Sequence, residues 1–347
     1  MIGASQPGTS PRTTDPPVRA PDGDDLVSCG LYRDHYGGGI RLFVGDAYGP
    51  HTAKIPANLP GGEGLMYRNR TDRKMLTDSQ RREFHRNGFL VVESGIDESL
   101  IDRAREAVWT AIDEDEDDRS TWAGENRSVS PEDTGDEEPF REINDRLFEF
   151  AESMVGDGRL PYESGPGAQL ALRFPREEEL TDPEAPQLSD VESHVDGTLD
   201  VEDGEGDVVP HTINGVAYLD RVQPYGGGFT AWPGSHRDVC RYVADHPIQS
   251  VQGGIRAPDG EGGWDETRSR DEVFDPLELT GDPGTVVLWH GRLEHEGGIN
   301  LRPGNVRMAH IKRFFHEDAW EMQERAPEEP YLGWDAMAGV VGDDYRI

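Results

Sequence analysis

The residue types of a metal centre occur in the second half of the chain. His194 and Asp196 are separated by Val195, and His295 follows far downstream, with Arg307 shortly after it. Two histidines and one carboxylate form the facial triad by which non-haem Fe(II) oxygenases hold iron, and this triad leaves coordination positions open for O2 and a co-substrate. The pattern therefore predicts an iron site of the kind that oxygenases use.

His-x-Asp occurs three times, as His194-Val195-Asp196, His236-Arg237-Asp238 and His316-Glu317-Asp318. Residues at i and i+2 lie on the same side of a strand but on different sides of a helix, and a central valine is typical of a strand. His236 follows a Pro-Gly-Ser turn and begins a helical pattern, whereas Asp318 resembles the cap of a later helix. Only the first pair is therefore predicted to bind metal.

The composition indicates an acidic, folded protein. The 347 residues contain 69 Asp and Glu against 34 Lys and Arg, a formal net charge of -35, and the only lysines are Lys54, Lys74 and Lys312. Such a charge destabilises a compact state in dilute buffer, but molar salt shortens the Debye length to about 3 Å and screens the repulsion. We therefore expect a cytoplasm rich in salt, as in a halophile.

Several partners and classes are disfavoured. An acidic surface repels phosphate, so neither nucleic acid nor an anionic membrane surface is an expected partner. Seven Trp and eleven Phe provide a core and argue against disorder for most of the chain. No signal segment and no run approaching ~20 apolar residues is visible, which predicts a soluble, cytoplasmic protein. Cys29 and Cys240 are too few for a disulfide framework and are expected to be free thiols. The oligomeric state stays open.

The chain is expected to hold one large catalytic domain with extensions. We predict a flexible tail over 1–25, an N-terminal extension over 26–74, the domain over 75–317 and a C-terminal extension over 318–347. In the first part of the domain, a capping box at Thr77 starts a helix that Gly88 ends, and a buried strand follows over 89–92. Helices are then predicted from apolar faces over 100–112 and 143–155, with a solvated acidic run at 113–118 between them.

After Pro166 the sequence changes to short strands separated by Gly and Pro. Such a succession predicts a barrel or a sandwich. The predicted strands are Gln169–Phe174, His194–Thr198, Thr212–Val222, Gly228–Trp232, Thr285–Trp289 and Val306–Phe315. The acidic stretch between Arg176 and Glu192 precedes the proposed ligands, so it is either a cover of the site or a solvated excursion.

Several motifs together resemble the phytanoyl-CoA dioxygenase (PhyH-like) family over roughly residues 75 to 317. They agree with the family in order and spacing, which is more specific than any single motif. The motifs are the helix and strand from Leu76 to Val92, the pair His194-Val195-Asp196, the segment from Gly227 to His236, the segment from Gly281 to Gly291, and His295 with Arg307.

The resemblance implies a mainly β fold with flanking helices, a double-stranded β-helix (jelly roll, cupin-like). It also implies Fe(II) and 2-oxoglutarate as cofactors. His194, Asp196 and His295 match the family's metal-ligand positions. Arg307 matches the basic residue that pairs with the far carboxylate of 2-oxoglutarate, and its planar fork suits that contact.

Two departures concern the co-substrate. Gly297 stands where family members often have a Ser that helps to hold the same carboxylate, and the region before Tyr218 lacks an aromatic residue often found near the co-substrate. Gln169 and Arg173 lie on the strand expected to face 2-oxoglutarate and are candidate contacts.

Two further histidines are alternatives to weigh. His290 competes with His295 as third ligand, and the family pattern favours His295. His211 is more simply a structural histidine than a residue of the cavity.

The predicted reaction is hydroxylation of a small molecule with O2 and 2-oxoglutarate, releasing succinate and CO2. Asp196 favours hydroxylation over halogenation, because halogenating relatives lack this carboxylate. No cluster of Lys or Arg is apparent in the proposed mouth, which favours a small neutral or cationic substrate over an anionic CoA ester. The alternatives are a non-catalytic metal-binding jelly-roll protein and a non-haem iron oxygenase that uses another co-substrate.

Overall fold

The computed structural model describes residues 75–122, 126–163, 167–176, 193–196, 212–245, 249–251, 254–256, 276–319 and 330–341. The chain divides into two units, 1–62 and 63–347, and every described residue belongs to the second. The predicted tail over 1–25, the predicted extension over 26–74, Cys29, His211 and the acidic stretch from 177 to 192 lie outside the described residues.

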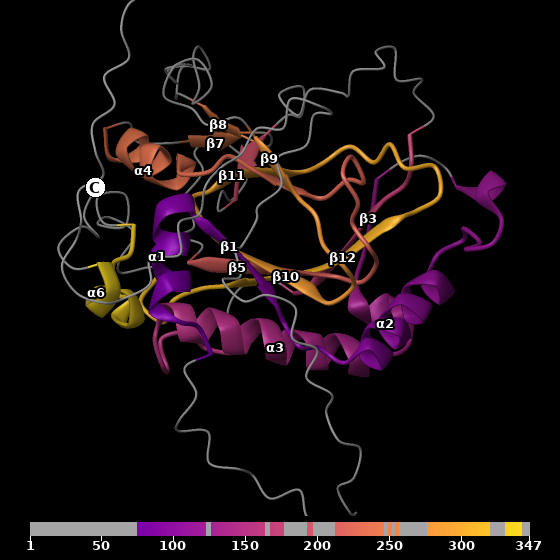
Figure 1. Ribbon diagram of the computed structural model, residues 1–347, viewed down its shortest axis with the longest axis horizontal. Coiled ribbons are helices and arrows are strands. Elements are labelled where there is room, and N and C mark those ends of the chain that lie inside the picture. The colour runs from indigo at the N-terminus through magenta and orange to yellow at the C-terminus, as the bar shows by residue number, and fades with distance from the viewer. Residues whose placement is uncertain are drawn as a thin grey trace, which may run out of the picture. The chain divides into compact units, whose positions relative to one another are not determined.

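The larger sheet has six antiparallel strands and forms one wall of the domain (Figure 1). In spatial order they are β1 (Phe89–Glu93), β10 (Thr285–His290), β5 (Ile213–Tyr218), β12 (Arg307–Phe314), β3 (Gln169–Arg173) and β2 (Arg127–Val129). Strands far apart in the chain are therefore neighbours, and β12 lies between β5 and β3 near the middle of the sheet.

The smaller sheet has four antiparallel strands and carries the predicted metal ligands. Its order is β4 (His194–Val195), β11 (Glu294–Gly297), β6 (Phe229–Ala231) and β9 (Leu277–Leu279). A separate hairpin pairs β7 (Gln249–Val251) with β8 (Gly254–Arg256). Two antiparallel sheets with helices on the outside form the jelly roll, so the predicted fold is confirmed.

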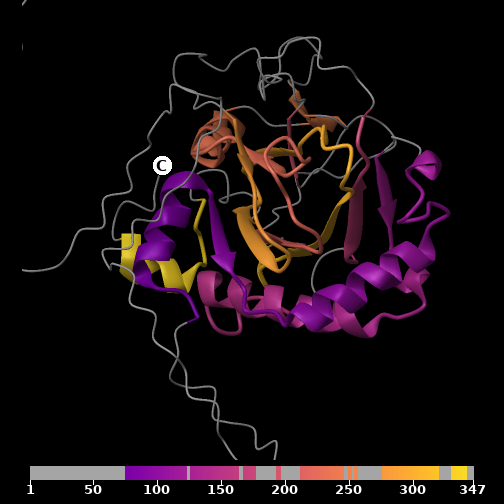
Figure 2. The same cartoon turned by 45° about the vertical axis from the view of Figure 1, so that its right-hand side comes forward.

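Helices cover the outer face of the larger sheet. α3 (Glu138–Val155) packs on β5, β12 and β10, α2 (Glu98–Ala111) packs beside α3, and both lie beneath the sheet in Figure 2. α1 (Asp78–Asn87) packs on β1, α4 (Ser235–Asp245) packs on β11, and α6 (Asp335–Val341) packs on α1 and α3. Two short 3-10 turns, η1 (Arg119–Thr121) and η2 (Pro131–Thr134), lie between α2 and α3.

Side chains alternate between the two faces of the larger sheet, so the hydrophobic core has two parts. On β5, Ile213 and Ala217 pack with the helices, whereas Val216 and Tyr218 face the space between the sheets. On β12, Met308 packs with the helices and Ala309 faces the interior. Because successive side chains of a strand point to opposite faces, odd positions of β12 and even positions of β5 share the interior. That interior contains the site.

The predicted capping box and the helix that it starts are confirmed. The side chain of Thr77 accepts from the backbone N–H of Gln80, whose side chain in turn accepts from the N–H of Thr77, and these bonds form the capping box of α1. Gly88 ends the helix at φ +79°, and a Cβ there would lie 2.4 Å from Nδ1 of His236. Both the backbone conformation and the close approach therefore require glycine.

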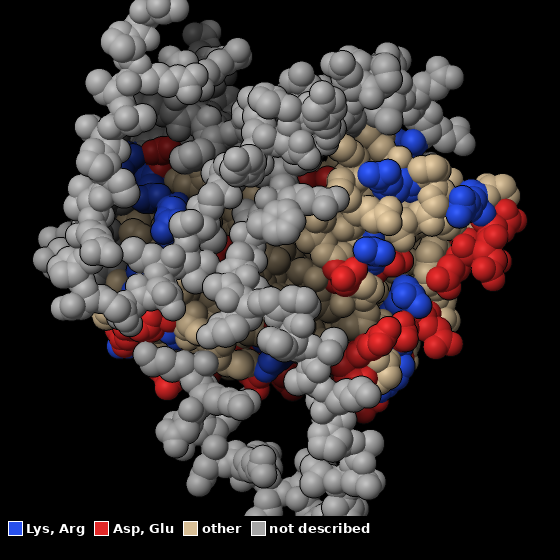
Figure 3. Space-filling model, in the orientation of Figure 1, with Lys and Arg blue, Asp and Glu red and all other residues tan. Residues whose placement is uncertain are grey.

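Other predictions were correct in kind but not in extent. The strand expected over Thr212–Val222 ends at Tyr218, and β9 and β11 were not predicted as strands. The acidic run 113–118 is exposed except for Glu114, which is buried and pairs with Arg127 at 2.8 Å. Acidic side chains gather at the edge of the visible face near α2, with basic side chains between them (Figure 3). No helix among the described residues has the length and apolar character that a membrane span requires.

Candidate metal centre

The two predicted histidines lie side by side on neighbouring strands. β11 pairs with β4 so that His295 lies opposite His194, and their ring centroids are 4.5 Å apart. Val195 between the two predicted ligands is buried, as expected for a strand, and Asp196 follows directly after β4. A strand therefore exists where one was predicted over His194–Thr198, but it covers only His194–Val195 and does not include Asp196, and residues 197 and 198 lie outside the described residues.

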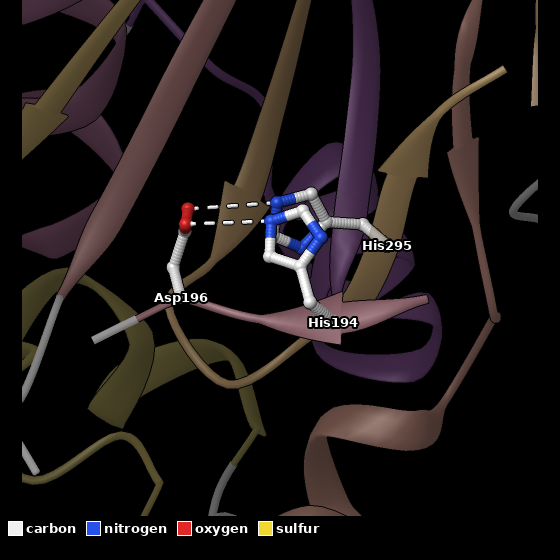
Figure 4. Close-up of side chains that lie close together, drawn as sticks. All are labelled: His194, Asp196 and His295. Atoms are coloured by element: carbon white, nitrogen blue, oxygen red, sulfur yellow. Dashed lines mark ion pairs between the residues drawn. The ribbon is translucent and has the colours of Figure 1, made fainter. Parts of the chain in front are cut away.

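Three donor atoms meet at this point. Asp196 directs Oδ1 toward Nε2 of His194 at 3.7 Å and Oδ2 toward Nε2 of His295 at 3.5 Å (Figure 4). Two ligands that each lie ~2.1 Å from one ion are at most ~4.2 Å apart, so both separations fit a shared metal. Among the described residues, these three form the one group of His, Cys, Asp and Glu with such spacing.

Hydrogen bonds orient both imidazoles. Nδ1 of His295 donates to the carbonyl oxygen of Leu293 at 2.8 Å, and Nδ1 of His194 lies 3.0 Å from Oε2 of Glu296. When Nδ1 carries the proton in both rings, Nε2 offers a lone pair toward Asp196. Metal-binding histidines characteristically use one nitrogen for the ion and the other for an oxygen acceptor. Glu296 was not predicted from the sequence.

The two histidines differ in electrostatics. Burial lowers the pKa of His295 to about 4, although the charge of Asp196 opposes the shift. Burial also acts to lower the pKa of His194, but hydrogen bonds to Asp196 and Glu296 outweigh it and raise this pKa to about 9. A metal ion that binds Nε2 of His194 must therefore displace a proton, so metal binding should weaken as the pH falls.

Asp196 is held from the larger sheet. Nδ2 of Asn214 on β5 donates to Oδ2 at 3.0 Å, and Nε of Arg313 on β12 approaches the same oxygen at 3.4 Å. Arg313 also approaches Oε1 of Gln169 on β3 at 3.3 Å. Asn214 and Arg313 were not predicted, because only the pairing of β5 with β12 brings them opposite each other.

A second group of charges lies at the other end of β12. Arg307 is buried, and its guanidinium donates to the carbonyl oxygens of Gly227 at 2.6 Å and Ala171 at 3.2 Å. Arg173, its register partner on β3, pairs with Glu296 at 2.8 Å. Burial and then the charge of Arg173 lower the pKa of Arg307 to about 10, so the guanidinium of Arg307 remains charged at neutral pH.

The structure separates the two candidate contacts on β3. Arg173 lies near Arg307, whereas Gln169 lies four residues along the strand beside Arg313. No cluster of Lys or Arg was expected in the proposed site, whereas Arg173 and Arg307 lie together there. Arg173, Arg307 and Arg313 all project into the interior, because they occupy the inward positions of two adjacent strands.

The competing histidines lie elsewhere. His290 uses both ring nitrogens, since Nδ1 accepts from the N–H of Arg292 at 3.0 Å and Nε2 donates to the carbonyl of Pro330 at 2.7 Å. Nε2 of His236, at the start of α4 as predicted, bonds the hydroxyl of Tyr331 at 2.9 Å, and Nε2 of His316 contacts the carbonyl of Gly333 at 3.2 Å. These three histidines bind the segment 330–333 and do not belong to the metal group.

The family comparison covers the segment that contains all three donor residues. Residues 192–309 match the family model described as phytanoyl-CoA dioxygenase (PhyH). This segment is similar to the PhyH family. It is shorter than the range over which the motifs resemble the family, and it contains both β4 and β11 as well as Arg307. No curated protein matches the chain.

Solved structures similar to the chain have low identity. The epimerase SnoN in complex with Fe3+, alpha ketoglutarate and nogalamycin RO is 16% identical, with a TM-score of 0.45, over 68% of this chain and 82% of that one. HygX from Streptomyces hygroscopicus with nickel and 2-oxoglutarate is 16% identical, with a TM-score of 0.43, over 69% and 87%. AviO1 from Streptomyces viridochromogenes Tue57 is 19% identical, with a TM-score of 0.41, over 70% and 95%.

Proposed function

We propose that the protein is an Fe(II)- and 2-oxoglutarate-dependent dioxygenase that hydroxylates a small molecule and releases succinate and CO2. The observation that carries the proposal is the meeting of His194, Asp196 and His295 inside the segment that matches the PhyH family model. Two imidazoles and one carboxylate are the ligand set of non-haem Fe(II) oxygenases. The presence of Asp196 favours hydroxylation over halogenation, because a halide would need its position on the metal.

In this proposal the protein residues fix geometry. Leu293 and Glu296 orient the two imidazoles, and Asn214 orients the carboxylate. Bound iron would supply the activation of O2, coupled to decarboxylation of 2-oxoglutarate. Phe229 and Trp289 pack on the ring of His295, with centroids 5.1 and 5.3 Å away, and shield this side of the site from water.

The co-substrate is proposed to bind between the metal ligands and Arg307. A buried guanidinium beside a second one is a strong site for a carboxylate, because an anion relieves their mutual repulsion and accepts bidentate hydrogen bonds. Arg307 and Arg173 would then hold the far carboxylate of 2-oxoglutarate. Gln169 and Asp196 both contact the guanidinium of Arg313, so Gln169 lies at the Asp196 end of the site. It would contact the keto-acid end of 2-oxoglutarate.

The experiment compares Arg307→Leu with wild type, using anaerobically iron-loaded protein. A lost charge-assisted contact costs roughly 2 to 5 kcal/mol, or at least about a tenfold weakening, when the remaining charge stays buried. We expect the dissociation constant for 2-oxoglutarate to rise at least tenfold while iron occupancy stays nearly unchanged. Arg221→Leu is the matched control, because Arg221 is an exposed arginine that pairs with Asp282 at the surface.

The outcome also separates the alternatives. Substrate-independent decarboxylation of 2-oxoglutarate by the wild type supports the proposal. Iron binding without 2-oxoglutarate binding would indicate an oxygenase with another co-substrate or a non-catalytic metal-binding protein. A cytoplasmic, salt-rich setting is part of the proposal and rests on the net charge of -35.

A further inference from the structure

Arg313 is a cation of the interior that the proposed co-substrate site does not use. It lies six residues after Arg307 on β12 and faces the same side of the strand. At ~3.3 Å per residue the two backbone positions are roughly 20 Å apart. Arg307 lies at the Gly227 end of the site and Arg313 lies at the Asp196 end.

The guanidinium of Arg313 is incompletely bound. Its contacts to Asp196 at 3.4 Å and Gln169 at 3.3 Å are longer than the usual range of roughly 2.7–3.2 Å. Its side chain is 20% exposed, against 9% for Asp196. Toward the described residues, the guanidinium therefore has donors left for a ligand that enters the site.

Arg173, Arg307 and Arg313 differ in whether a neighbouring carboxylate would be engaged by bound iron. Arg173 pairs with Glu296, and the charge of Glu278 reaches Arg307. Among the described residues, Arg313 has one ion pair, and its partner is the predicted metal ligand Asp196. Once the charge of Asp196 is engaged by a divalent ion, Arg313 has no other carboxylate partner among the described residues.

From these contacts we infer that Arg313 recognises the substrate, and that the substrate carries an anionic group, a carboxylate or a phosphate monoester. This inference rests on the proposed function and names the substrate class of the same site. Arg307 and Arg173 would hold the co-substrate at one end of β12, and Arg313 would hold the anion of the substrate at the other. The carbon to be oxidised would then lie between Arg313 and the metal.

A simpler role for Arg313 is to position Asp196. That role predicts an effect on metal affinity and none on the charge preference of the ligand. Asn214 already donates a shorter bond to the same oxygen, so Asp196 does not depend on Arg313 alone for its position. The two roles therefore differ in a measurable way.

The test uses full-length protein loaded anaerobically with Fe(II) and 2-oxoglutarate, after binding of both has been measured for each variant. Small carboxylates paired with their amides, and phosphate monoesters paired with their alcohols, are screened by thermal shift and then titrated by calorimetry. The variants are Arg313→Gln, which removes the charge, and Arg313→Lys, which keeps it. Lys312→Gln is the matched control, because Lys312 is the neighbouring cation on β12 and its ammonium lies 6.0 Å from the ring of Phe314.

We expect acids or phosphates to bind at least tenfold more tightly than their neutral partners. Arg313→Gln should abolish that preference, Arg313→Lys should keep part of it, and Lys312→Gln should leave it intact. A screen in which no anion binds better than its neutral partner overturns the inference, and so does an anion preference that survives in Arg313→Gln. Arg313→Gln could instead lose iron while the preference for anions stays unchanged in Arg313→Lys and in iron-replete Arg313→Gln. That result overturns the inference and shows that Arg313 only positions Asp196. Failure of the wild type to bind Fe(II) or 2-oxoglutarate instead contradicts the proposed function.

Discussion

The guanidinium of Arg173 fills the space that a side chain at position 297 would need. A Cβ built on Gly297 would lie 2.4 Å from Nη2 of Arg173 and 2.8 Å from Nη2 of Arg307. The glycine that departs from the family pattern therefore permits two guanidiniums to lie together. A charged donor stands where relatives often have the hydroxyl of a serine.

Replacing Gly297 with Ser should weaken 2-oxoglutarate binding, although Ser is often found there in the family. The added Cβ and hydroxyl would push Arg173 away from Glu296, and loss of a charge-assisted contact weakens binding by about tenfold. Stability should change little, because the displaced atoms are the far end of the flexible side chain of Arg173. Calorimetric titration of 2-oxoglutarate measures the effect.

A double variant provides the control for this prediction. In Arg173→Ala the space is vacant, so adding Gly297→Ser should cause no further loss and should restore some affinity. Tighter binding by Gly297→Ser alone would show that Arg173 does not act in the co-substrate site.

The metal prediction distinguishes His295 from His290. Replacing His194, Asp196 or His295 with Ala should lower iron occupancy severely, because each supplies one of the three converging donors. His290→Gln is the control, since both nitrogens of His290 are already hydrogen bonded, and this variant should keep its iron. Iron content after anaerobic loading and desalting measures occupancy. Full occupancy in His295→Ala would falsify the assignment.

The buried His290 should make stability depend on pH. Burial, chiefly, lowers the pKa of His290 from 6.5 to about 4, so the native ring is neutral and its Nδ1 can accept from the N–H of Arg292. Below pH 6.5 the unfolded chain takes up a proton that the native state refuses, so stability is present above pH 6.5 and is lost as the pH falls toward 4. The loss is at most about 3 kcal/mol.

Urea unfolding of metal-free protein between about pH 7.5 and 4 tests this dependence. This range begins roughly one pH unit above the pKa of an unfolded histidine. Other groups also titrate in this range, so the relevant quantity is the difference between wild type and His290→Gln. This difference should shrink as the pH falls. A difference that is constant with pH would show that His290 does not contribute to the slope.

Salt should stabilise the protein. At a net charge of -35, repulsion opposes the compact state, and about 1 M salt reduces the screening length to ~3 Å. We expect the thermal midpoint to rise from low to molar KCl. A parallel series in sucrose, which acts by exclusion from the protein surface and leaves charges unscreened, is the control. A midpoint that is flat or falls with KCl contradicts the prediction.

Residues with a strong local pattern could be predicted from the sequence. His194 and Asp196 flank a buried valine, and the capping box at Thr77 carries its own signal. β11 was missed because Glu294, His295, Glu296 and Gly297 lack the β-branched and aromatic residues typical of strands. Its pairing with β4 and β6 determines its structure instead.

The remainder of the site depends on contacts between distant strands. Arg313 meets Asp196 only through the packing of the two sheets, and Arg173 meets Gly297 only through the interior that they enclose. No local spacing encodes either contact. Arg307 could be predicted because the family resemblance marks its position, whereas its neighbour Arg173 could be named only as one of two candidates on the same strand.

The three histidines that bind the segment 330–333 have a practical consequence for shortened forms of the protein. A chain ending at residue 317, where the motif resemblance stops, would remove Pro330, Tyr331 and Gly333. His236 and His290, both at most 3% exposed, would lose their partners and meet water beside Phe84, which packs on Tyr331 and Trp334. Shortened forms that lack residues 330–334 should therefore be prone to aggregation even though every proposed metal ligand is present.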